Sequence, residues 1–265
     1  MRRAMSHAAI FSRLGRLLGL PALDALHATR VAVFGLGGVG SWCAESLVRS
    51  GVGRLLLVDS DRVCVTNVNR QLMATVRTVG EVKVDVLARR LREINPDVAL
   101  DARPQAYAAE TAASFDLAAY DYVVDAIDSL SEKAALIRHA LSLPSVTLFS
   151  SMGAALKTDP FQIRATPFRK VAGDGLARAL RQKFKKTGGL PARPFTCVWS
   201  PERRENLGPA EPDAPTPGAD SWTARKARVN GTVAHIPAIF GFALAGLVVS
   251  GVERRLRARL SGRES

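Results

Sequence analysis

The feature that most constrains the fold is a glycine-rich turn between an apolar strand and a helix. Arg30 to Phe34 reads RVAVF, a run typical of a short buried strand, and it leads directly into GLGGVG. The next ten residues, SWCAESLVRS, have helical spacing and stop at Gly51. A strand, a tight glycine turn and a helix in this order indicate the first unit of a doubly wound α/β fold.

The glycines of this turn have separate physical roles. Gly35 permits a tight exit from the strand, Gly37 lets the backbone approach a phosphate, and Gly40 lets the helix pack closely. Gly38 lies in the same turn. The N-terminus of the helix offers unpaired N–H groups to an anion. Asp59, 19 residues beyond Gly40, is placed to accept hydrogen bonds from ribose hydroxyls, so the pattern predicts a nucleotide that carries a ribose.

Strands and helices continue to alternate beyond this unit. Apolar runs predict strands over Arg54–Val58, Val98–Leu100, Asp121–Ile127 and Val146–Phe149, and helical spacing predicts a helix over residues 80–95. Ser129 and Glu132 have the capping-box spacing for a further helix. The alternation is typical of an α/β protein. We therefore expect a Rossmann-like, doubly wound, mainly parallel sheet with a basic C-terminal extension.

The positive charge of the chain is concentrated in its second half. The chain of 265 residues has 37 Lys and Arg against 24 Asp and Glu, a net charge of +13. Residues 1–152 carry a net of +2 and residues 153–265 a net of +11. The apolar fraction of 47% excludes wholesale disorder and collagen. The basic half indicates an anionic partner, with nucleic acid as the first candidate.

Eight of the basic residues lie close together in residues 164–186, against a single acid, Asp174. We predict that they contact nucleic-acid phosphates. They are Arg164, Arg169, Lys170, Arg178, Arg181, Lys183, Lys185 and Lys186. The aromatic side chains available nearby to stack on an unpaired base are Phe168, Phe184, Phe195 and Trp199.

The cysteines and the N-terminus indicate a reducing, cytoplasmic location. Cys43, Cys64 and Cys197 are too few for a disulfide scaffold, and the chain has no C-x-x-C pair for a thiolate zinc site. The N-terminal sequence MRRAMSHAAIFSR has no apolar run long enough for a signal peptide. Nothing beside Cys197 would lower its pKa, so we interpret that residue as structural.

Two segments of the second half have unusual composition. Residues 201–218 are rich in Pro, Gly and acids and are predicted to form a loop. Residues 229–252 carry no formal charge and are long enough to span a bilayer. The run also contains Asn230, Thr232 and His235. A buried interface helix is therefore favoured over membrane association.

The residues after Asp59 separate an enzyme that attacks ATP from a dehydrogenase. They read DSDRVCVTNVNRQ, followed by VGEVK and later by DAIDS. A dehydrogenase needs no such group of Asn, Arg and Lys beside its nucleotide. In phosphoryl chemistry, charge builds on phosphate oxygens, and fixed cations and Mg²⁺ offset it. Asp128, at the carboxyl end of a strand, offers the hard oxygen that Mg²⁺ prefers.

These motifs together resemble the ubiquitin-activating-enzyme-like (ThiF-type) ATP-dependent adenylating enzymes. The motifs are GLGGVG, D-x-D, N-x-N-R-Q, V-G-x-x-K and D-A-I-D-S. Within that group the chain is most similar to the bacterial tRNA threonylcarbamoyladenosine dehydratases, through VCVTNVNRQ, DAIDS and CVWSPE. The resemblance covers residues 11–205, with a looser match at PAIFGFALAG.

The resemblance implies specific roles at the motif positions. Asp59 would bind the ribose, Asp128 would bind Mg²⁺ or orient the α-phosphate, and the catalytic contacts to the triphosphate would come from Arg70 and Lys83. The full set of ATP-binding residues implied in this way is Gly35, Gly37, Gly38, Gly40, Asp59, Asp61, Asn67, Arg70, Lys83 and Asp128. Asp125 is interpreted as structural.

The resemblance also implies a homodimer with a shared site. Its members have an arginine near the N-terminus, in an aromatic-x-Arg context, that reaches the ATP of the neighbouring protomer. Phe11-Ser12-Arg13 fits this context, and Arg16 lies nearby. Arg13 is therefore the fourth expected catalytic residue, and the C-terminal apolar segment is expected to be covered.

The reaction implied by the resemblance is an ATP-dependent dehydration of threonylcarbamoyladenosine beside the tRNA anticodon, through an acyl-adenylate. ATP, Mg²⁺ and tRNA are the expected ligands, and a sulfurtransferase-system protein is a candidate partner. Residues 1–165 would form the ATP-binding adenylation core. Residues 166–265 would add a basic insertion and an apolar helical segment that completes the same domain.

Three alternatives remain open from the sequence. The chain could adenylate the C-terminus of a ubiquitin-like sulfur-carrier protein, although the zinc-type cysteines of such enzymes are missing. It could be an NAD-binding oxidoreductase or redox-sensing module, which would leave Asn67, Arg70 and Lys83 unexplained. It could also bind a nucleotide as a scaffold without turnover.

Overall fold

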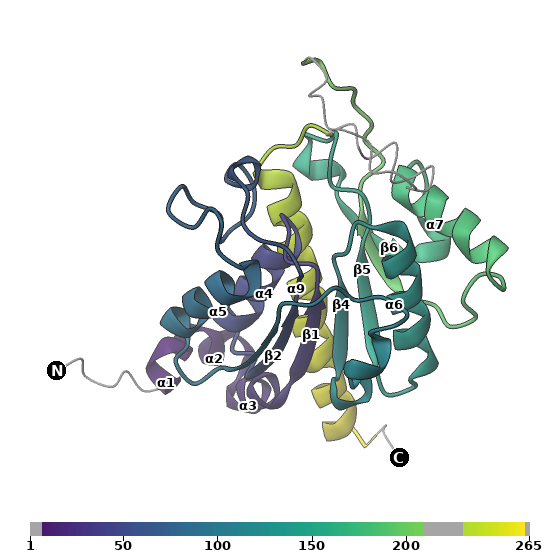
Figure 1. Ribbon diagram of the computed structural model, residues 1–265. Coiled ribbons are helices and arrows are strands. Elements are labelled where there is room, and N and C mark those ends of the chain that lie inside the picture. The colour runs from purple at the N-terminus through teal and green to yellow at the C-terminus, as the bar shows by residue number, and fades with distance from the viewer. Residues whose placement is uncertain (1–6, 209–229, 263–265) are drawn as a thin grey trace.

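The computed structural model describes residues 7–208 and 230–262. Within this part of the chain, seven strands form one sheet in the order β3-β2-β1-β4-β5-β7-β6 (Figure 1). All neighbours pair parallel except β6 and β7, which pair antiparallel. The expected mainly parallel, doubly wound sheet is confirmed. The strands are β1 (Arg30–Phe34), β2 (Arg54–Val58), β3 (Ala99–Arg103), β4 (Tyr122–Asp125), β5 (Thr147–Ser151), β6 (Arg164–Pro167) and β7 (Thr196–Trp199).

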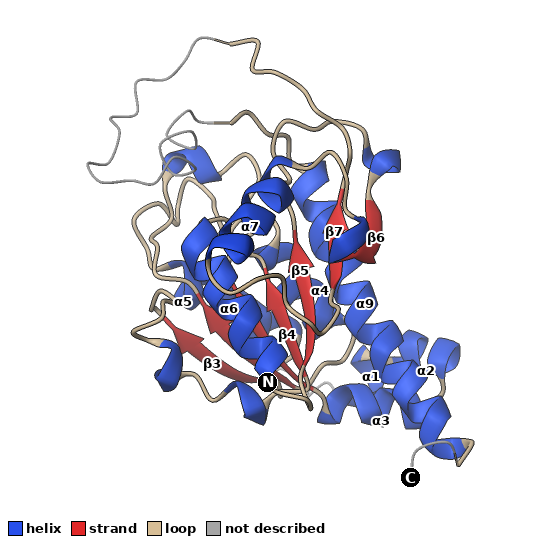
Figure 2. Ribbon diagram, turned by 90° about the vertical axis from the view of Figure 1, so that its right-hand side faces the viewer, coloured by secondary structure: helices blue, strands red, loops and turns tan. Residues whose placement is uncertain are grey.

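Helices cover both faces of this sheet (Figures 1 and 2). One apolar core joins one face to α4, α5 and α9, and a second core joins the other face to α6 and α7. The helices are α1 (His7–Ile10), α2 (Ser12–Leu18), α3 (Leu20–Ala28), α4 (Gly40–Arg49), α5 (Lys83–Ile94), α6 (Leu130–Ser142), α7 (Gly175–Lys186) and α9 (His235–Leu260).

The strand sequences explain this three-layer arrangement. In β1, Val31 and Val33 belong to the core under α4, α5 and α9, and Ala32 and Phe34 belong to the core under α6 and α7. Successive side chains of a strand point to opposite faces, so a strand buried on both faces is apolar throughout. The continuous run RVAVF is therefore what a central parallel strand requires.

Several boundaries differ from those expected. The third strand runs to Arg103 rather than Leu100, because it pairs along the whole length of β2. The helix predicted over residues 80–95 begins at Lys83. Ser129 is the residue before α6, as expected, but its hydroxyl donates to the Glu132 carboxylate instead of capping a backbone N–H.

The sheet extends across the boundary expected between residues 165 and 166. That boundary falls inside β6, and β7 lies directly beside β5. Neither of these strands was predicted, and the basic segment contains the regular helix α7. Of the loop expected over residues 201–218, residues 201–208 contain no helix or strand. Residues 209–218 lie outside the described part of the chain.

The C-terminal apolar segment is one helix, α9, which continues through the arginine-rich sequence ERRLRARL. It packs on α4, on α3 and on β5 and β7. Among the described residues, α9 is long and apolar enough to cross a membrane, with a mean hydropathy of 1.9 over its most apolar window. However, 56% of that window is buried inside the protein, as in the core helix of a soluble fold. Val229, the first residue of the expected segment, lies outside the described residues.

Candidate functional site

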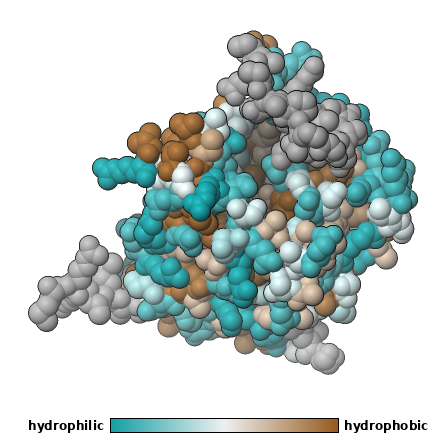
Figure 3. All heavy atoms as spheres, in the orientation of Figure 1, coloured by the Kyte–Doolittle hydropathy of each residue, from teal (hydrophilic) through white to brown (hydrophobic). Residues whose placement is uncertain are grey.

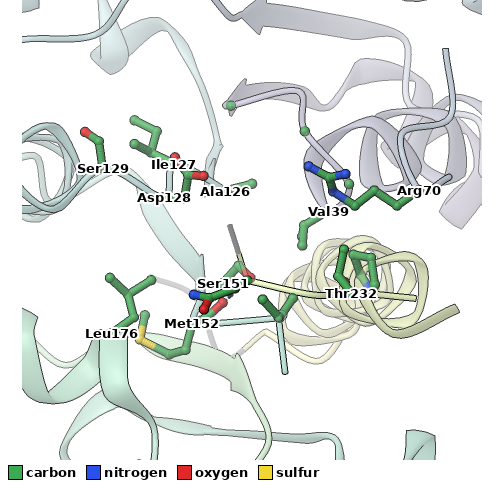
Figure 4. A pocket seen from close by; sticks show the side chains of 18 of the residues that line it. Val39, Arg70, Ala126, Ile127, Asp128, Ser129, Ser151, Met152, Leu176 and Thr232 are labelled. Carbon is green, nitrogen blue, oxygen red and sulfur yellow. Dashed lines mark hydrogen bonds between the residues drawn. The ribbon is translucent and has the colours of Figure 1, made fainter. Parts of the chain in front are cut away.

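A cavity of about 970 Å³ lies at the carboxyl ends of the parallel strands (Figure 4). Its walls come from the segments that follow β1, β2, β4 and β5. Residues 105–107, 173–176, 202–204, 230, 232 and 237 complete them. β1 and β4 are neighbours in the sheet, and the connections from them turn to opposite faces. Doubly wound folds bind their ligands at this switch point.

The glycine turn has the steric need for glycine that its sequence predicted. Gly35 has a φ of +84°, and a Cβ there would lie 2.7 Å from the carbonyl oxygen of Ala126. A Cβ on Gly40 would lie 1.8 Å from the carbonyl oxygen of Gly35. The turn therefore closes tightly on itself and on the end of β4. Gly35, Gly37 and Gly38 line the cavity, and Gly40 begins α4.

Asp59 links the end of β2 to this turn. Its Oδ2 accepts a hydrogen bond from the Leu36 N–H at 2.6 Å, and its Oδ1 accepts one from the Asp61 N–H at 2.9 Å. Burial raises the pKa of Asp59, and the positive charge of Lys83 opposes that rise. Each carboxylate oxygen has two lone pairs, so the same group can accept a further hydrogen bond from a ribose hydroxyl.

Lys83 is a buried cation held by two acids. Its Nζ lies 2.8 Å from Asp61 Oδ2 and 3.9 Å from Asp59 Oδ1, and the residue is only 4% exposed. It is the first residue of α5, so its position depends on where that helix begins. All three residues line the cavity.

Asn67 and Arg70 reach the cavity from the short helical turn η1 (Val65–Asn67) and the residues after it. Asn67 Oδ1 accepts a hydrogen bond from the Cys64 N–H at 3.0 Å. Arg70 Nη1 donates to the Thr66 carbonyl at 2.8 Å and to Asn69 Oδ1 at 3.0 Å. These bonds fix both side chains at the cavity wall, where Figure 4 shows Arg70 beside Val39.

The two aspartates after β4 have different surroundings. Asp125 is fully buried, 2.7 Å from Lys133 Nζ, and accepts a hydrogen bond from Ser150 Oγ at 2.6 Å. Asp128 is exposed and lines the cavity. The geometry agrees with a structural role for Asp125 and leaves Asp128 accessible to a ligand.

The residues present fit a magnesium ion bound together with phosphates. The described residues contain no group of three His, Cys, Asp or Glu side chains placed to hold a metal ion. Mg²⁺ usually takes one or two carboxylates and completes its shell with water and substrate phosphates. The single carboxylate of Asp128 matches this mode.

A second group of cavity residues was missed in the sequence. Lys157, Asp174, Glu202, Arg203 and Arg204 line the wall that follows β5 and β7. Glu202 accepts hydrogen bonds from the Thr158 and Asp159 N–H groups at 2.9 and 2.8 Å. No local motif links these residues. The available signals were the acid in CVWSPE, which is Glu202, and the isolated acid Asp174 within the basic segment.

Arg13 does not line the cavity of its own chain. It is exposed on α2, which lies with α1 and α3 towards the lower end of the molecule in Figure 1, away from the carboxyl ends of the strands. Any contribution of Arg13 to an ATP site must therefore come from a second protomer.

The eight basic residues of the segment 164–186 divide into two kinds. Arg164, Arg169, Lys170, Arg178, Lys185 and Lys186 are exposed, and Lys183 is half-buried beside Ser131. Arg181 donates to the Phe168 carbonyl at 2.9 Å and lies 5.0 Å from the centre of the Phe168 ring. Arg181 therefore holds the start of this segment against α7.

The expected base-stacking aromatics are not available in this structure. Phe168, Phe184, Phe195 and Trp199 are at most 6% exposed and belong to the core under α6 and α7. This prediction is wrong because α7 and β7 are regular elements that turn their aromatic residues inward. The exposed aromatic side chains among the described residues are Phe161 and Phe242.

The burial of Cys197 agrees with the structural role expected for it, whereas Cys64 lines the cavity. Cys43 and Cys197 are buried, and burial raises the pKa of both. Cys64 is exposed beside Asn67, and hydrogen bonding by Thr66 lowers its pKa.

The family comparison agrees with this geometry, because the ThiF family matches residues 11–253. The chain belongs to the ThiF family. It is 39% identical over 244 residues to the tRNA threonylcarbamoyladenosine dehydratase of Bacillus subtilis, covering 90% of this chain and 92% of that one. It is 40% identical over 197 residues to the enzyme of the same name from Escherichia coli, covering 72% and 73% of the two chains.

A solved structure matches this fold along nearly the full length of both chains. It is the tRNA N6-threonylcarbamoyladenosine dehydratase of E. coli in complex with ATP, at 33% identity and a TM-score of 0.80, covering 99% of this chain and 100% of that one. A complex of that enzyme with AMP matches at a TM-score of 0.78. The resemblance inferred from the five motifs is therefore confirmed. The E. coli protein MccB, at 15% identity and a TM-score of 0.60, shares the fold alone.

Proposed function

We propose that this protein catalyses the ATP-dependent dehydration of threonylcarbamoyladenosine beside the anticodon of tRNA. The observation that carries the proposal is a single cavity that holds the five adenylation motifs, in a chain that matches dehydratases of this name over nine tenths of its length. The ATP and AMP complexes of the E. coli relative correspond to the nucleotide before and after such a reaction.

The proposed chemistry has two steps. A carboxylate oxygen of the threonyl group attacks the α-phosphorus of ATP, the bond from that phosphorus to the bridging oxygen of the leaving group breaks, and pyrophosphate departs. A neighbouring nucleophile of the same modification then attacks the activated acyl carbon and loses a proton. AMP leaves with the original carboxylate oxygen. Water is thereby removed in the net reaction, and no enzyme nucleophile is required.

The protein contributes position and charge to these steps. The glycine turn and the N-terminus of α4 hold phosphates, Asp59 holds the ribose, and Arg70 and Lys83 offset negative charge on the triphosphate. Mg²⁺ at Asp128 would neutralise charge on the phosphate oxygens. These assignments also include Gly35, Gly37, Gly38, Gly40, Asp61 and Asn67 as ATP-binding residues.

The exposed basic residues of the segment 164–186 would contact the tRNA backbone. Phosphate contacts of this kind supply affinity without sequence information. Arg181 would contribute to this surface indirectly, because its hydrogen bond to the Phe168 carbonyl holds α7 in place. The modified base would then enter the cavity from the side lined by residues 202–204.

A homodimer would complete the site and cover the apolar surface that the single chain exposes. Val65, Val76 and Val79 are exposed on the segment between β2 and α5, where Figure 3 shows apolar side chains gathered at the upper left. Phe242 of α9 packs edge-on against the Trp42 ring and is still 47% exposed. Within such a dimer Arg13 would reach the ATP of the neighbouring protomer. A monomer in sedimentation equilibrium would contradict this part of the proposal.

The remaining expectations follow from the same proposal. An enzyme that acts on tRNA would work in the cytoplasm, and α9 would serve as a core and interface helix rather than a membrane anchor. A sulfurtransferase-system protein stays a candidate partner. The two ranges 1–165 and 166–265 would act as one catalytic domain, the first binding ATP and the second the tRNA.

The deciding experiment supplies labelled ATP and tRNA that carries the modification. The proposal expects AMP and pyrophosphate to form only with modified tRNA, and mass spectrometry to show the nucleoside lighter by one water. Absence of tRNA-dependent AMP would overturn it. AMP formation with a small carrier protein ending in Gly-Gly would instead favour sulfur-carrier adenylation, the activity named for a Thermus thermophilus relative that is 40% identical over 112 residues.

A further inference from the structure

The topology of the sheet divides the cavity into two halves. The glycine turn follows β1, and Asp59, the expected ribose ligand, follows β2. The nucleotide therefore extends from the phosphate turn towards β2. The opposite direction along the sheet leads from β4 to β5 and β7. We call the wall after β1, β2 and β4 the nucleotide half, and the wall formed by residues 151–157, 173–176 and 202–204 the acceptor half.

Lys157 is the buried cation of the acceptor half. The residue lines the cavity and is only 6% exposed. Its Nζ donates to the carbonyl oxygen of Glu202 at 2.7 Å. Among the described residues no carboxylate lies within 4.0 Å of it. An ammonium group has three donors, so two are left without a partner among the described residues.

The nearest acids are held by other groups. Asp174 is the N-cap residue of α7 and accepts a hydrogen bond from the Ala177 N–H at 2.8 Å. The Glu202 carboxylate binds the backbone of Thr158 and Asp159. Neither acid is placed to form an ion pair with Lys157, although both attract its charge at longer range, and burial lowers the pKa of the lysine. A buried charge without a close counter-charge is costly.

The backbone around Lys157 is fixed in a strained conformation. Leu156 has a φ of 58°, the one positive φ of a non-glycine residue among those described. A leucine adopts this region only where its surroundings impose it. The Leu156 N–H donates to the Gly231 carbonyl at 3.0 Å, and the Leu156 carbonyl accepts from the Arg204 N–H at 3.1 Å. Lys157 is therefore aimed at the cavity by three separate chain segments.

We propose that Lys157 is a specificity-determining residue that binds the carboxylate of the acceptor substrate and presents it to the α-phosphate. This inference rests on the proposed function, which supplies a carboxylate on a nucleoside. One carboxylate oxygen would take the free donors of Lys157, and the other would face the nucleotide half. The substrate carboxylate would then supply the close negative charge that the protein does not place beside Lys157. The site would therefore select modified tRNA over tRNA that lacks the carboxylate.

The test compares Lys157→Met and Lys157→Gln with the unaltered protein. The measured quantity is the ratio of dissociation constants for unmodified and modified tRNA, without ATP. We expect modified tRNA to bind about 10- to 100-fold more tightly to the unaltered protein, as a hydrogen-bonded charge pair would give. In both variants the ratio should fall close to one, with the ATP dissociation constant unchanged. Arg92→Gln, on the exposed face of α5, is the control for losing one positive charge.

A second measurement uses only the unaltered protein. The modified nucleoside and its carboxyl methyl ester compete with modified tRNA, and the acid should compete more strongly by the same ratio. Equal competition by acid and ester would overturn the role of Lys157, as would variants that keep the tRNA ratio or lose ATP binding instead. Failure of the proposed function has a different signature, because the unaltered protein would then form no AMP with modified tRNA.

Discussion

The two halves of the cavity treat their buried lysines in opposite ways. In the nucleotide half, Lys83 lies 2.8 Å from Asp61 and 3.9 Å from Asp59. In the acceptor half, Lys157 has a carbonyl oxygen as its hydrogen-bond partner. A lysine paired with acids helps to hold the folded site. A lysine whose partner is neutral is stabilised most when an anionic ligand binds. The difference separates a cation whose charge the protein already balances from one whose counter-charge a bound substrate would supply.

The largest expected effect comes from a substitution in the nucleotide half, at Asp128. Asp128→Ala should lower the rate of AMP formation by about 10²- to 10³-fold, because it removes the expected Mg²⁺ ligand from the phosphate chemistry. The fold should be unaffected, since Asp128 is exposed and precedes the first residue of α6. Radiolabelled ATP and modified tRNA measure the rate, and circular dichroism monitors the fold.

Asp128→Asn is the matched control for that variant, because it keeps the size of the side chain and removes its charge. It should be nearly as slow as the alanine variant. An asparagine variant with full activity would show that charge at this position is not needed. Loss of folded protein in either variant would make Asp128 a structural residue.

The next effect compares the two lysines directly through stability. Lys83→Met leaves the partly buried Asp59 without its nearest cation and should lower the free energy of unfolding by about 2 kcal/mol. This is less than for a fully buried pair, because Asp61 is exposed. Lys157→Met removes a buried charge that has no carboxylate within 4.0 Å among the described residues, so it should leave stability unchanged or raise it. Urea unfolding of the two variants makes the comparison. Equal destabilisation would remove the distinction between the two halves.

The two halves also differ in how far the sequence could reveal them. The nucleotide half comes from segments that are continuous in the chain, residues 35–40 and 59–83, and each follows a recognisable apolar strand. A glycine turn and a nearby acid are local patterns with a known geometry. All but Gly40 of the residues predicted from these two segments therefore line the cavity, and their roles stay predictions.

The acceptor half depends on long-range pairing that no local pattern contains. Lys157, Asp174 and Glu202 come together because β7 inserts beside β5. The strand β6 has a largely exposed burial pattern and contains Arg164 and Pro167, so it carries no apolar alternation. It is an edge strand, where proline is tolerated. The basic character of residues 164–186 could be recognised in the sequence. The helix α7 within them was not predicted, although its apolar face is buried.

A smaller effect is expected in the basic segment, where one cation is bonded to the protein and another is exposed. Arg181→Gln should lower the free energy of unfolding by about 1–2 kcal/mol, because it removes hydrogen bonds to two carbonyls and the contact with the Phe168 ring. Lys185→Gln, on an exposed position of the same helix, should leave stability unchanged. Denaturant unfolding of both variants measures the difference.

The same pair of variants should behave differently towards RNA. Lys185→Gln should weaken tRNA binding and lower the slope of log affinity against log salt by about one. If Arg181→Gln changed that slope by as much while remaining stable, the division into packing and phosphate-contacting cations would be wrong.

The smallest effect concerns the charge of Asp174, which faces the same half as Lys157. Burial raises the pKa of Asp174, while the Ala177 N–H and the charge of Lys157 oppose the rise. The folded protein therefore keeps a proton on this carboxyl above its usual pKa of about 3.9. Between that value and the raised pKa the folded state binds more protons than the unfolded state, so this group makes stability fall as the pH rises.

Asp174→Asn removes that dependence and keeps an oxygen that can accept the Ala177 N–H. Urea unfolding between pH ~4 and ~7 should show that the variant's free energy of unfolding rises relative to that of the unaltered protein as the pH rises. The gain should be less than about 1 kcal/mol. In a Lys157→Met background the gain should be larger, because the carboxylate has lost its attracting charge. A stability difference that stays flat with pH in the unaltered background, and appears only in the Lys157→Met background, would mean that Asp174 already neutralises Lys157. The acceptor half would then be paired like the nucleotide half.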